Sequence, residues 1–491
     1  MANKLKIVSI ASEIAPFSKT GGLADVARSL PKAIKRLGHE VIAITPLYGK
    51  AIDKKEHNLK LIYENVKVIL NSKEEIEVNF WQGYLMKDLP IYFVENKKYF
   101  SRKKALYGSS HENLRYFIFD AAALKLLTML KFKADIIHCH DWQTGLIPYL
   151  LKNDLRYSKS LGNAKTIYTI HNLVFQLGRN WWQVPTDKKD FGKKKLPSIA
   201  DPDFEFINFA KRGILCADII NTVSEQYREE IMTKSFGQDL DRILRNRKDK
   251  LFGIINGIDY KAFNPAVDQD LFKNYDHRKI HRKKLNKLFL QQKFKLPEDP
   301  EMPIICTTSR LTFQKGFELI LKILGHLLKL DVQIIIIGTG DKTYIKDLAK
   351  IAKKHPKKMA LIPSHDQLLK YETMVYAGSD FILLPSHHEP CGINQLKAMR
   401  YGCVPIVRRV GGLYDTVKNF NPTTNQGTGF TFGAFDAFSF FEAVIRALET
   451  HKYKKVFREI IVRGMKESNS WQIPAKKYVT LYKKALDGKK K

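Results

Sequence analysis

Two neighbouring segments decide the fold: the apolar run Ile7–Ala11, and Lys19-Thr20-Gly21-Gly22-Leu23-Ala24-Asp25, which follows it after a short connecting stretch. The first is typical of a buried strand, and the second opens a segment over 26–37 whose apolar residues recur at helical spacing. Glycines at a strand-to-helix turn let a ligand approach the backbone, and the free N–H groups of a helix start attract anions. The chain therefore begins with an α/β unit that carries a candidate anion site.

Strand-like and helix-like segments alternate through the rest of the chain, which is typical of mostly parallel sheets with ligands at the carboxyl ends of the strands. We expect two Rossmann-like domains that face each other across a deep interdomain cleft. The N-terminal domain is predicted to cover residues 1–253, with a C-terminal helix over 472–491 crossing back to it, and the second domain residues 254–471. Further expectations are a helix over 113–130, a strand over 40–44 and a basic, helix-like segment over 270–295.

Size and composition indicate a globular enzyme. The 491 residues are 44% hydrophobic, enough for two or three domains with cores of their own, and no apolar run is long enough to span a membrane. Five scattered cysteines without a C-x-x-C pair fit a reducing compartment and argue against a disulfide framework or a structural zinc site. We expect a cytoplasmic protein.

The net charge of +33 is unusual for such a chain and permits a nucleic-acid-binding protein. The basic residues are spread over many short runs, however, and the chain has neither zinc-finger spacing nor an aromatic RNA-binding signature. A solvated basic surface is the favoured interpretation, and specific nucleic-acid binding remains the rival.

Charged residues follow two predicted strands of the second domain. Arg310 and Lys315 come after the strand 304–309, where both cations could reach one diphosphate. Glu389 follows the strand 381–384 and precedes Pro390-Cys391-Gly392, a turn that leads into a helix, and its carboxylate could accept hydrogen bonds from sugar hydroxyls. A solvated loop or a helix cap would explain each motif alone. Two phosphate-attracting sites on separate α/β units together suggest an enzyme that handles a sugar nucleotide.

Polar and aromatic residues also follow strands of the first domain, in His138-Cys139-His140-Asp141-Trp142 and His171-Asn172. A metal site would need further ligands, and none is evident. An indole ring beside polar groups is typical of carbohydrate sites, although His138 could equally be a core histidine. Trp181-Trp182 could be a glucan platform or local packing, and the sequence leaves both open.

Together, these motifs resemble those of the bacterial glycogen synthases and plant starch synthases, which are retaining glucosyltransferases of the GT-B architecture. The similarity covers nearly the whole chain in family order. The matching stretches are 12–25, 140–142, 169–173, 256–259, 309–316 and 385–392. The resemblance implies transfer of glucose from ADP-glucose to the non-reducing end of an α-1,4-glucan such as glycogen, with retention and without a metal or cofactor.

The resemblance also implies roles for individual residues. The diphosphate would be contacted by Lys19, the backbone of Gly21 and Gly22, Arg310 and Lys315. The donor glucose would be held by Glu389, Cys391, Gly392, Asn256 and His171. The acceptor side would contain Asp25, Asp141 and Trp142, and the residues assigned to catalysis would be His171, Glu389, Arg310, Lys315 and Asp141.

The chain departs from the family pattern at three places. His387-His388 replace the usual Arg-Phe, Phe263 replaces a tryptophan, and Gln367 aligns with the tyrosine that stacks on adenine in relatives. A gap in that alignment would instead place His365 or Tyr371 at the base. An enzyme of the same fold that uses UDP-glucose or another acceptor therefore remains an alternative.

Overall fold

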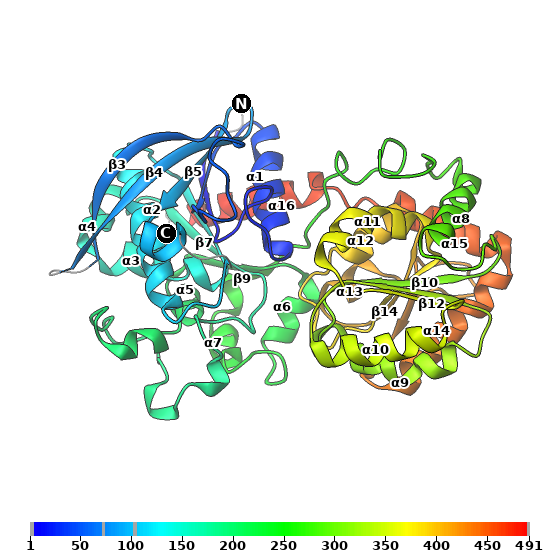
Figure 1. Ribbon diagram of the computed structural model, residues 1–491. Coiled ribbons are helices and arrows are strands. Elements are labelled where there is room, and N and C mark those ends of the chain that lie inside the picture. The colour runs from blue at the N-terminus through cyan, green and yellow to red at the C-terminus, as the bar shows by residue number, and fades with distance from the viewer. Residues whose placement is uncertain (1–3, 71–73, 102–105, 489–491) are drawn as a thin grey trace. The chain divides into compact units, whose positions relative to one another are not determined.

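The structure is a computed structural model that describes residues 4–70, 74–101 and 106–488. It divides into two compact units, Met1–Ile254 with Trp471–Lys491, and Ile255–Ser470. These divisions lie one residue from the predicted boundaries at 253/254 and 471/472. Each unit is an α/β sheet covered by helices (Figure 1).

The first unit is built on a nine-stranded sheet in the order β3-β4-β5-β2-β1-β6-β7-β8-β9. All neighbouring strands are parallel except those that pair with β4, which is antiparallel to both β3 and β5. The strands are β1 (Lys6–Ile10), β2 (Glu40–Pro46), β3 (Lys60–Ile69), β4 (Glu75–Met86), β5 (Leu89–Glu95), β6 (Ile136–His140), β7 (Lys165–Ile170), β8 (Ile219–Thr222) and β9 (Leu251–Gly253).

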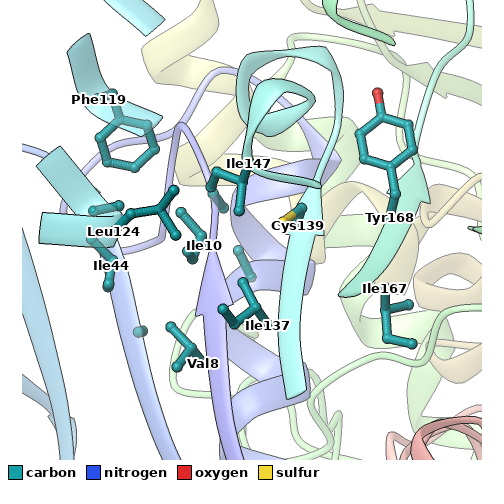
Figure 2. Packing of buried hydrophobic residues seen from close by; sticks show 14 of the residues in the cluster. Val8, Ile10, Ile44, Phe119, Leu124, Ile137, Cys139, Ile147, Ile167 and Tyr168 are labelled. Atoms are coloured by element: carbon teal, nitrogen blue, oxygen red, sulfur yellow. The ribbon is translucent and has the colours of Figure 1, made fainter. Parts of the chain in front are cut away.

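Helices cover both faces of this sheet because its central strands are buried on both sides. Val8, Ile10 and Ile137 point toward α2 and α3, where Leu124 and Ile147 complete an apolar core (Figure 2). The opposite face is covered by α16, which packs beside α1 and β7 (Figure 1). The helices of this unit are α1 (Gly22–Arg36), α2 (Glu112–Met129), α3 (Leu146–Asn153), α4 (Leu155–Leu161), α5 (Phe209–Cys216), α6 (Glu225–Ile231), α7 (Asp241–Asn246) and α16 (Gln472–Asp487).

The second unit has a six-stranded, fully parallel sheet in the order β12-β11-β10-β13-β14-β15. Its strands are β10 (Ile304–Thr308), β11 (Gln333–Ile337), β12 (Met359–Ile362), β13 (Phe381–Leu384), β14 (Val404–Arg408) and β15 (Phe430–Phe432). Its helices are α8 (Lys283–Lys293), α9 (Phe317–Leu327), α10 (Lys342–Lys354), α11 (His365–Gly378), α12 (Asn394–Arg400), α13 (Gly411–Thr416), α14 (Ala437–Lys452) and α15 (Lys454–Lys466). Helices α11 and α12 lie on one face, and α9, α10 and α14 on the other (Figure 1).

The helix predicted over 472–491 corresponds to α16, and the last part of that prediction, residues 489–491, lies outside the described residues. The other predicted elements agree with these bounds to within a few residues, with one exception. The segment 270–295 is helical only in α8 and in the short turn Ile280–Arg282 that precedes it. The residues before them form loops pinned by polar side chains. Asn274 Nδ2, for example, donates to the carbonyls of Pro265 and Asp268, at 3.2 and 2.7 Å.

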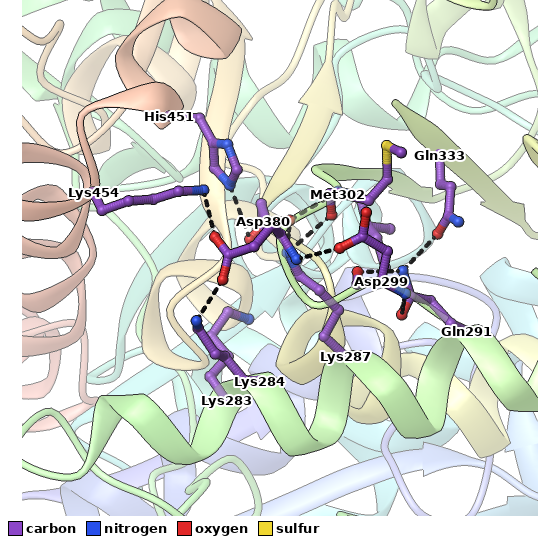
Figure 3. A network of polar contacts seen from close by, with 12 residues as sticks. Lys283, Lys284, Lys287, Gln291, Asp299, Met302, Gln333, Asp380, His451 and Lys454 are labelled. Carbon is purple, nitrogen blue, oxygen red and sulfur yellow. Dashed lines mark hydrogen bonds and ion pairs between the residues drawn. The ribbon is translucent and has the colours of Figure 1, made fainter. Parts of the chain in front are cut away.

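A buried ion pair connects α8 to the sheet of the second unit (Figure 3). Lys287 Nζ lies 2.6 Å from Asp380 Oδ2, and both side chains are less than a tenth exposed. The same carboxylate oxygen accepts the backbone N–H of Ile304, and Lys287 also donates to the carbonyl of Met302. The Lys287 ammonium holds the pKa of Asp380 well below its ordinary value, against the opposing effect of burial. The pair therefore fixes the start of β13 against both α8 and β10.

We expect Lys287→Met to destabilise the second unit by about 3–5 kcal/mol, because it removes the ammonium group that pairs with the buried Asp380 carboxylate. The contact that remains to this carboxylate from His451 Nε2 is longer, at 3.8 Å. Lys284→Met is a matched control on the same helix. Lys284 pairs with Glu301, but both side chains are more than half exposed, so its loss should cost less than about 1 kcal/mol. Denaturant unfolding monitored in the second unit measures both effects, and equal losses would contradict the role given to the buried pair.

Candidate functional site

The glycine-rich turn of the first unit is held by a carboxylate that the sequence analysis did not single out. Glu13, just after β1, is 2% exposed and accepts the backbone N–H of Thr20 at 2.7 Å and its hydroxyl at 2.8 Å. Burial raises the pKa of Glu13 to about 7, against hydrogen bonds from Thr20, Gly21 and Ala24 that lower it. The sequence signal that could have identified Glu13 was an acidic residue close behind the apolar run of β1. Glu13 thus determines the path of the chain into α1.

Gly21 and Gly22 lie at the exposed start of α1. The φ and ψ of Gly21, −157° and −162°, are open to any residue, and a Cβ there would meet only Glu13 Oε1 at 4.0 Å. Neither backbone strain nor packing within this unit therefore requires glycine at this position. Room for a ligand beside the backbone would explain it. Lys19, in the same turn, donates to both carboxylate oxygens of Asp25 at 2.8 and 2.9 Å.

Asp141, at the end of β6, has a backbone conformation that non-glycine residues rarely adopt, with φ 60° and ψ 179°. Its Oδ1 accepts the backbone N–H groups of His171, at 2.7 Å, and of Asn172, at 3.3 Å. Burial raises the pKa of Asp141 to about 7, these hydrogen bonds oppose the rise, and the nearby Glu13 adds to it. Such strain is often found at functional sites, and here the carboxylate fixes the strand end that carries His171.

The histidines of this unit form hydrogen-bonded chains. His138 contacts the Tyr482 hydroxyl of α16 through Nδ1, at 2.8 Å, and the Thr169 hydroxyl through Nε2, at 2.7 Å. His140 Nε2 contacts Ser9 Oγ at 3.3 Å, and His140 Nδ1 contacts His171 Nε2 at 3.0 Å. Burial lowers the pKa of His138 and His171 to about 3 and that of His140 well below its ordinary value. His138 is therefore a satisfied core histidine. Within the described residues no three His, Cys, Asp or Glu side chains cluster as metal ligands would.

The tryptophans differ in exposure. Trp142 is 5% exposed and packs edge-on against Tyr116 and Phe209, so its ring could support an acceptor site from beneath but presents little surface to one. Trp181 is buried in a small apolar cluster, whereas Trp182 is 61% exposed and donates from its indole nitrogen to Gln238. Of the pair Trp181-Trp182, local packing explains the first, and only the second offers an open ring.

The second unit brings Lys315 and Glu389 together at the carboxyl ends of β10 and β13. Lys315 Nζ donates to Glu389 Oε2 at 2.6 Å, and the Ser386 hydroxyl donates to the same oxygen at 3.0 Å. Glu389 is 6% exposed, whereas Arg310 is exposed at the end of β10. The pair places a positive and a negative group side by side, as a ligand with an anionic half and a hydroxylated half would require.

The turn after Glu389 fits tightly against the start of α13. A Cβ on Gly411 would lie 2.0 Å from the Glu389 carbonyl oxygen, and one on Gly412 would lie 2.0 Å from that of Cys391. Gly392 adopts φ +67°, which favours glycine. Burial raises the pKa of Cys391 to about 12, so the thiol is uncharged at neutral pH, although its contact with Asn256 opposes the rise. The turn is thus a rigid support for Glu389.

Three buried polar atoms on these segments have no hydrogen-bond partner among the described residues: Asn256 Oδ1, Thr312 Oγ1 and His388 Nε2. Buried polar atoms are normally paired, and three unpaired ones near the Lys315–Glu389 pair favour a polar ligand. Asn256 also contacts Cys391, so it lies against the turn that supports Glu389.

The departures from the family pattern occupy different surroundings. His387 packs against the rings of Phe313 and Phe435, at centroid distances of 5.1 and 4.9 Å. Phe263 packs against an apolar cluster beneath α12. Gln367 lies in the first turn of α11, where its backbone N–H is capped by Ser364.

Two doubly wound units, one with a glycine-rich turn at a helix start and the other with a Lys–Glu pair at its strand ends, fit a glycosyltransferase of the GT-B fold, and the comparisons show that class. Residues 6–246 match the family described as starch synthase catalytic domain, and residues 289–461 match glycosyl transferases group 1. The chain is 39% identical to glycogen synthase 2 of Geobacter sulfurreducens and 38% identical to the glycogen synthase of Thermotoga maritima, in each case over 98% of this chain and 99% of the relative. It belongs to the glycogen synthase and starch synthase family.

Solved structures agree with this assignment. The catalytic domain of starch synthase IV from Arabidopsis thaliana, bound to ADP and acarbose, matches with a TM-score of 0.87 and 31% identity over 99% of this chain and all of that one. A sucrose-phosphate synthase from Thermosynechococcus elongatus shares the fold, with a TM-score of 0.61 and 17% identity over 99% of this chain and all of that one. No helix in the described ranges is long and apolar enough to cross a membrane.

The raised pKa of Glu13 predicts how stability depends on pH. Between pH 4.5, the ordinary pKa of a glutamate, and about pH 7, Glu13 keeps its proton in the folded state and releases it in the unfolded state. The stability that this group contributes is therefore complete below pH 4.5 and is lost as the pH rises toward 7, by about 1.4 kcal/mol per unit. We expect Glu13→Gln to make the decline in unfolding free energy of the first unit shallower across this window.

Unfolding titrations from pH 4.5 to 7.5 measure this slope. Glu56→Gln, an exposed change in the same unit, should leave the wild-type slope unchanged. The same slope in Glu13→Gln as in wild type would contradict a proton held by Glu13.

Proposed function

We propose that this protein transfers glucose from ADP-glucose to the non-reducing 4-OH of an α-1,4-glucan such as glycogen, with retention of configuration. The observation that carries the proposal is the Lys315–Glu389 pair, with Lys315 partly buried and Glu389 buried, at the carboxyl ends of β10 and β13. It occurs in a chain 38–39% identical to glycogen synthases over nearly its whole length. The ADP and acarbose bound to the Arabidopsis starch synthase IV domain support a nucleotide and a glucan-like ligand.

In this proposal the second unit, residues 254–471, is the nucleotide-sugar domain. Arg310 and Lys315 neutralise the leaving diphosphate, and on binding Lys315 exchanges part of its contact with Glu389 for phosphate oxygens. Glu389 then accepts hydrogen bonds from sugar hydroxyls, and Asn256 Oδ1 offers an unused acceptor. Cys391 and Gly392 contribute the backbone of the turn that fixes Glu389.

The first unit is the acceptor-side domain, residues 1–253 with the helix over 472–491. Lys19 and the backbone N–H groups of Gly21 and Gly22 contact the diphosphate. His171 contacts the donor sugar, and Asp25 and Asp141 act on the acceptor side, with Trp142 supporting that side from beneath. The open surface beside Gly21 supports this arrangement, because among the described residues a Cβ at this position would meet only Glu13 Oε1, at 4.0 Å.

Retention is proposed to follow from attack on the same face as departure. As the bond to the diphosphate breaks, Arg310 and Lys315 stabilise its growing negative charge, and a phosphate oxygen accepts the proton of the incoming 4-OH. This step needs neither a metal nor a cofactor, and it assigns no side chain as nucleophile.

We expect Lys315→Ala to lower kcat/KM for ADP-glucose by at least about 30-fold, since one lost electrostatic contact to a developing charge costs about 2–4 kcal/mol. Lys322→Ala, an exposed lysine on the following helix, is the matched control and should leave kcat/KM unchanged. The measurement is glucose incorporation into glycogen from labelled ADP-glucose. Rates within twofold of wild type for Lys315→Ala would remove Lys315 from the diphosphate site.

Donor choice is tested separately at Gln367, because an aromatic ring stacked on a base contributes about 1–3 kcal/mol. If Gln367 faces the base, ADP-glucose should be favoured over UDP-glucose by only about tenfold, and Gln367→Tyr should widen the margin. The comparison is kcat/KM for both donors in wild type and variant. A large ADP preference that the substitution leaves unchanged would exclude Gln367 as the base-facing residue and favour His365 or Tyr371.

The same donor screen, run with glycogen as acceptor, separates the proposal from its rivals. Turnover with UDP-glucose alone, or sugar-nucleotide turnover without glycogen extension, would indicate another member of the fold. Salt-sensitive nucleic-acid binding without any turnover would indicate the nucleic-acid interpretation.

We also propose that the protein acts in the cytoplasm. Its five cysteines are free, and the sulfur atoms of Cys306 and Cys403 lie only 4.0 Å apart in the core of the second unit. A reducing compartment would keep such neighbouring thiols unlinked.

A further inference from the structure

Ser9, His140 and His171 form a hydrogen-bonded chain in which Ser9 and His140 are buried and His171 is partly exposed, and the proposed reaction has not yet used the first two. Ser9 lies on β1 beside His138 of β6, and His140 lies two residues further along β6. The side chains of Ser9, His138 and His140 therefore share the sheet face covered by α16. His171 comes directly after β7, next to the end of β6. The contacts are Ser9 Oγ to His140 Nε2 at 3.3 Å and His140 Nδ1 to His171 Nε2 at 3.0 Å.

Both imidazoles of the chain are neutral at physiological pH. Burial lowers the pKa of His171 to about 3 and that of His140 further below its ordinary value, and neighbouring histidines add to the effect on His140. The surrounding groups with charge or a titratable proton are His138 on β6, Tyr478 and Tyr482 on α16, and Asp141 at the end of β6. A neutral imidazole has one nitrogen that donates a hydrogen bond and one that accepts.

The hydroxyl of Ser9 sets the direction of the chain. Ser9 is 3% exposed, and within the described part of the chain its hydroxyl has one hydrogen-bond partner, His140 Nε2. If Ser9 donates, His140 Nε2 is the accepting nitrogen and the His140 hydrogen is on Nδ1. That nitrogen then donates to His171 Nε2, so the hydrogen of His171 is on its Nδ1.

The opposite direction leaves a group unsatisfied. If His171 Nε2 donated to His140, and His140 Nε2 donated to Ser9, the Ser9 hydroxyl hydrogen would be buried without an acceptor, which proteins rarely tolerate. Tautomers follow from such hydrogen-bond accounting because hydrogen positions are assigned and not observed. His171 Nδ1 itself has no partner among the described residues, and the residue as a whole is partly exposed, so this nitrogen is available to a ligand.

We propose that Ser9 and His140 are positioning residues that hold His171 in the tautomer whose Nδ1–H donates a hydrogen bond to an oxygen of the donor sugar. The role toward the sugar rests on the proposed function, whereas the tautomer depends only on the chain of contacts. A fixed donor selects a sugar oxygen that can accept, and it costs no reorganisation when the substrate binds. Ser9 would thus act on the substrate through two imidazoles without touching it.

The tautomer is measured directly in the ligand-free, full-length protein labelled with ¹⁵N-histidine. Two-bond ¹⁵N–¹H correlation spectra distinguish the two neutral forms, and loss of one set of signals in His171→Gln assigns His171. We expect the Nδ1–H form in wild type. The Nε2–H form in the wild-type protein would overturn the inference whatever the enzyme does to sugar nucleotides.

Substitutions at Ser9 test the relay. Ser9→Ala removes the donating hydroxyl, and we expect His171 to shift toward the Nε2–H form and kcat with ADP-glucose to fall by about 10- to 100-fold, with a smaller change in KM. That range is typical for loss of a partner that orients a metal-ligating histidine, and we take it as the scale for a histidine that is oriented in the same way. Ser9→Thr keeps the hydroxyl and should retain both the tautomer and activity within about threefold. Ser379→Ala, which removes a buried hydroxyl that has no hydrogen-bond partner in the described second unit, should change neither readout.

The outcomes separate the inference from the function on which it rests. A wild-type enzyme that turns over no sugar nucleotide would overturn the proposed function, while its spectrum would still decide the tautomer. An unchanged tautomer in folded Ser9→Ala would overturn the relay. A shifted tautomer with full activity would overturn the contact between His171 and the sugar. The wild-type spectrum decides the direction of the chain even if Ser9→Ala fails to fold.

Discussion

The register of three parallel strands, β1, β6 and β7, is the constraint on which the polar interior of the first unit depends. Ser9 pairs with His138, and His140 pairs with Thr169. Because side chains alternate between faces, a slip of one residue would turn these groups into the apolar core around α2 and α3. The parallel sheet therefore sets both the core in Figure 2 and the histidine chain behind it, and Tyr482 of α16 closes that second face.

The two Gly-Gly-Leu segments of the chain show that one motif can serve two physical needs. At Gly411-Gly412 the neighbouring backbone leaves no room for a Cβ, so glycine is required by the fold and the segment supports Glu389. At Gly21 the backbone is open to any residue, and a Cβ there would meet only Glu13 Oε1, at 4.0 Å, among the described residues. The likeness between the segments therefore does not extend to their roles. Of the two segments, only Gly21-Gly22 is placed to let an external group approach the main chain.

Much of this arrangement could be predicted from the sequence, because apolar runs and glycine turns report local structure directly. The strand ends that carry Arg310, Lys315 and Glu389 were predicted in this way, and the structure brings Lys315 and Glu389 into contact. Ser9 and Glu13 were not singled out, because a polar residue within a buried strand or turn acquires meaning only when its neighbours are known.

Other features depend on tertiary contacts in the same way. Nothing local in the sequence indicates the positive φ of Asp141, whose carboxylate accepts backbone N–H groups of the two residues that follow β7. Whether Trp181 and Trp182 serve local packing or could form a glucan platform likewise became clear only from the exposure of each side chain in the structure. The resemblance to the family, in contrast, is visible in the sequence, because it rests on the order of motifs along the whole chain and not on any single contact.

The large positive charge acts on the proposed reaction only through its anionic participants. The glucan acceptor is neutral, so a net charge of +33 does not attract it. The same charge attracts both anions of the reaction, the donor ADP-glucose and the product ADP. ADP carries more negative charge than ADP-glucose, so a long-range positive field by itself favours the product. Discrimination in favour of the substrate must then come from groups that contact the sugar, which ADP lacks. In the proposed site these groups are Glu389, which is an acid, and His171, whose pKa burial lowers to about 3. Neither of them would add positive charge to the attraction of the diphosphate.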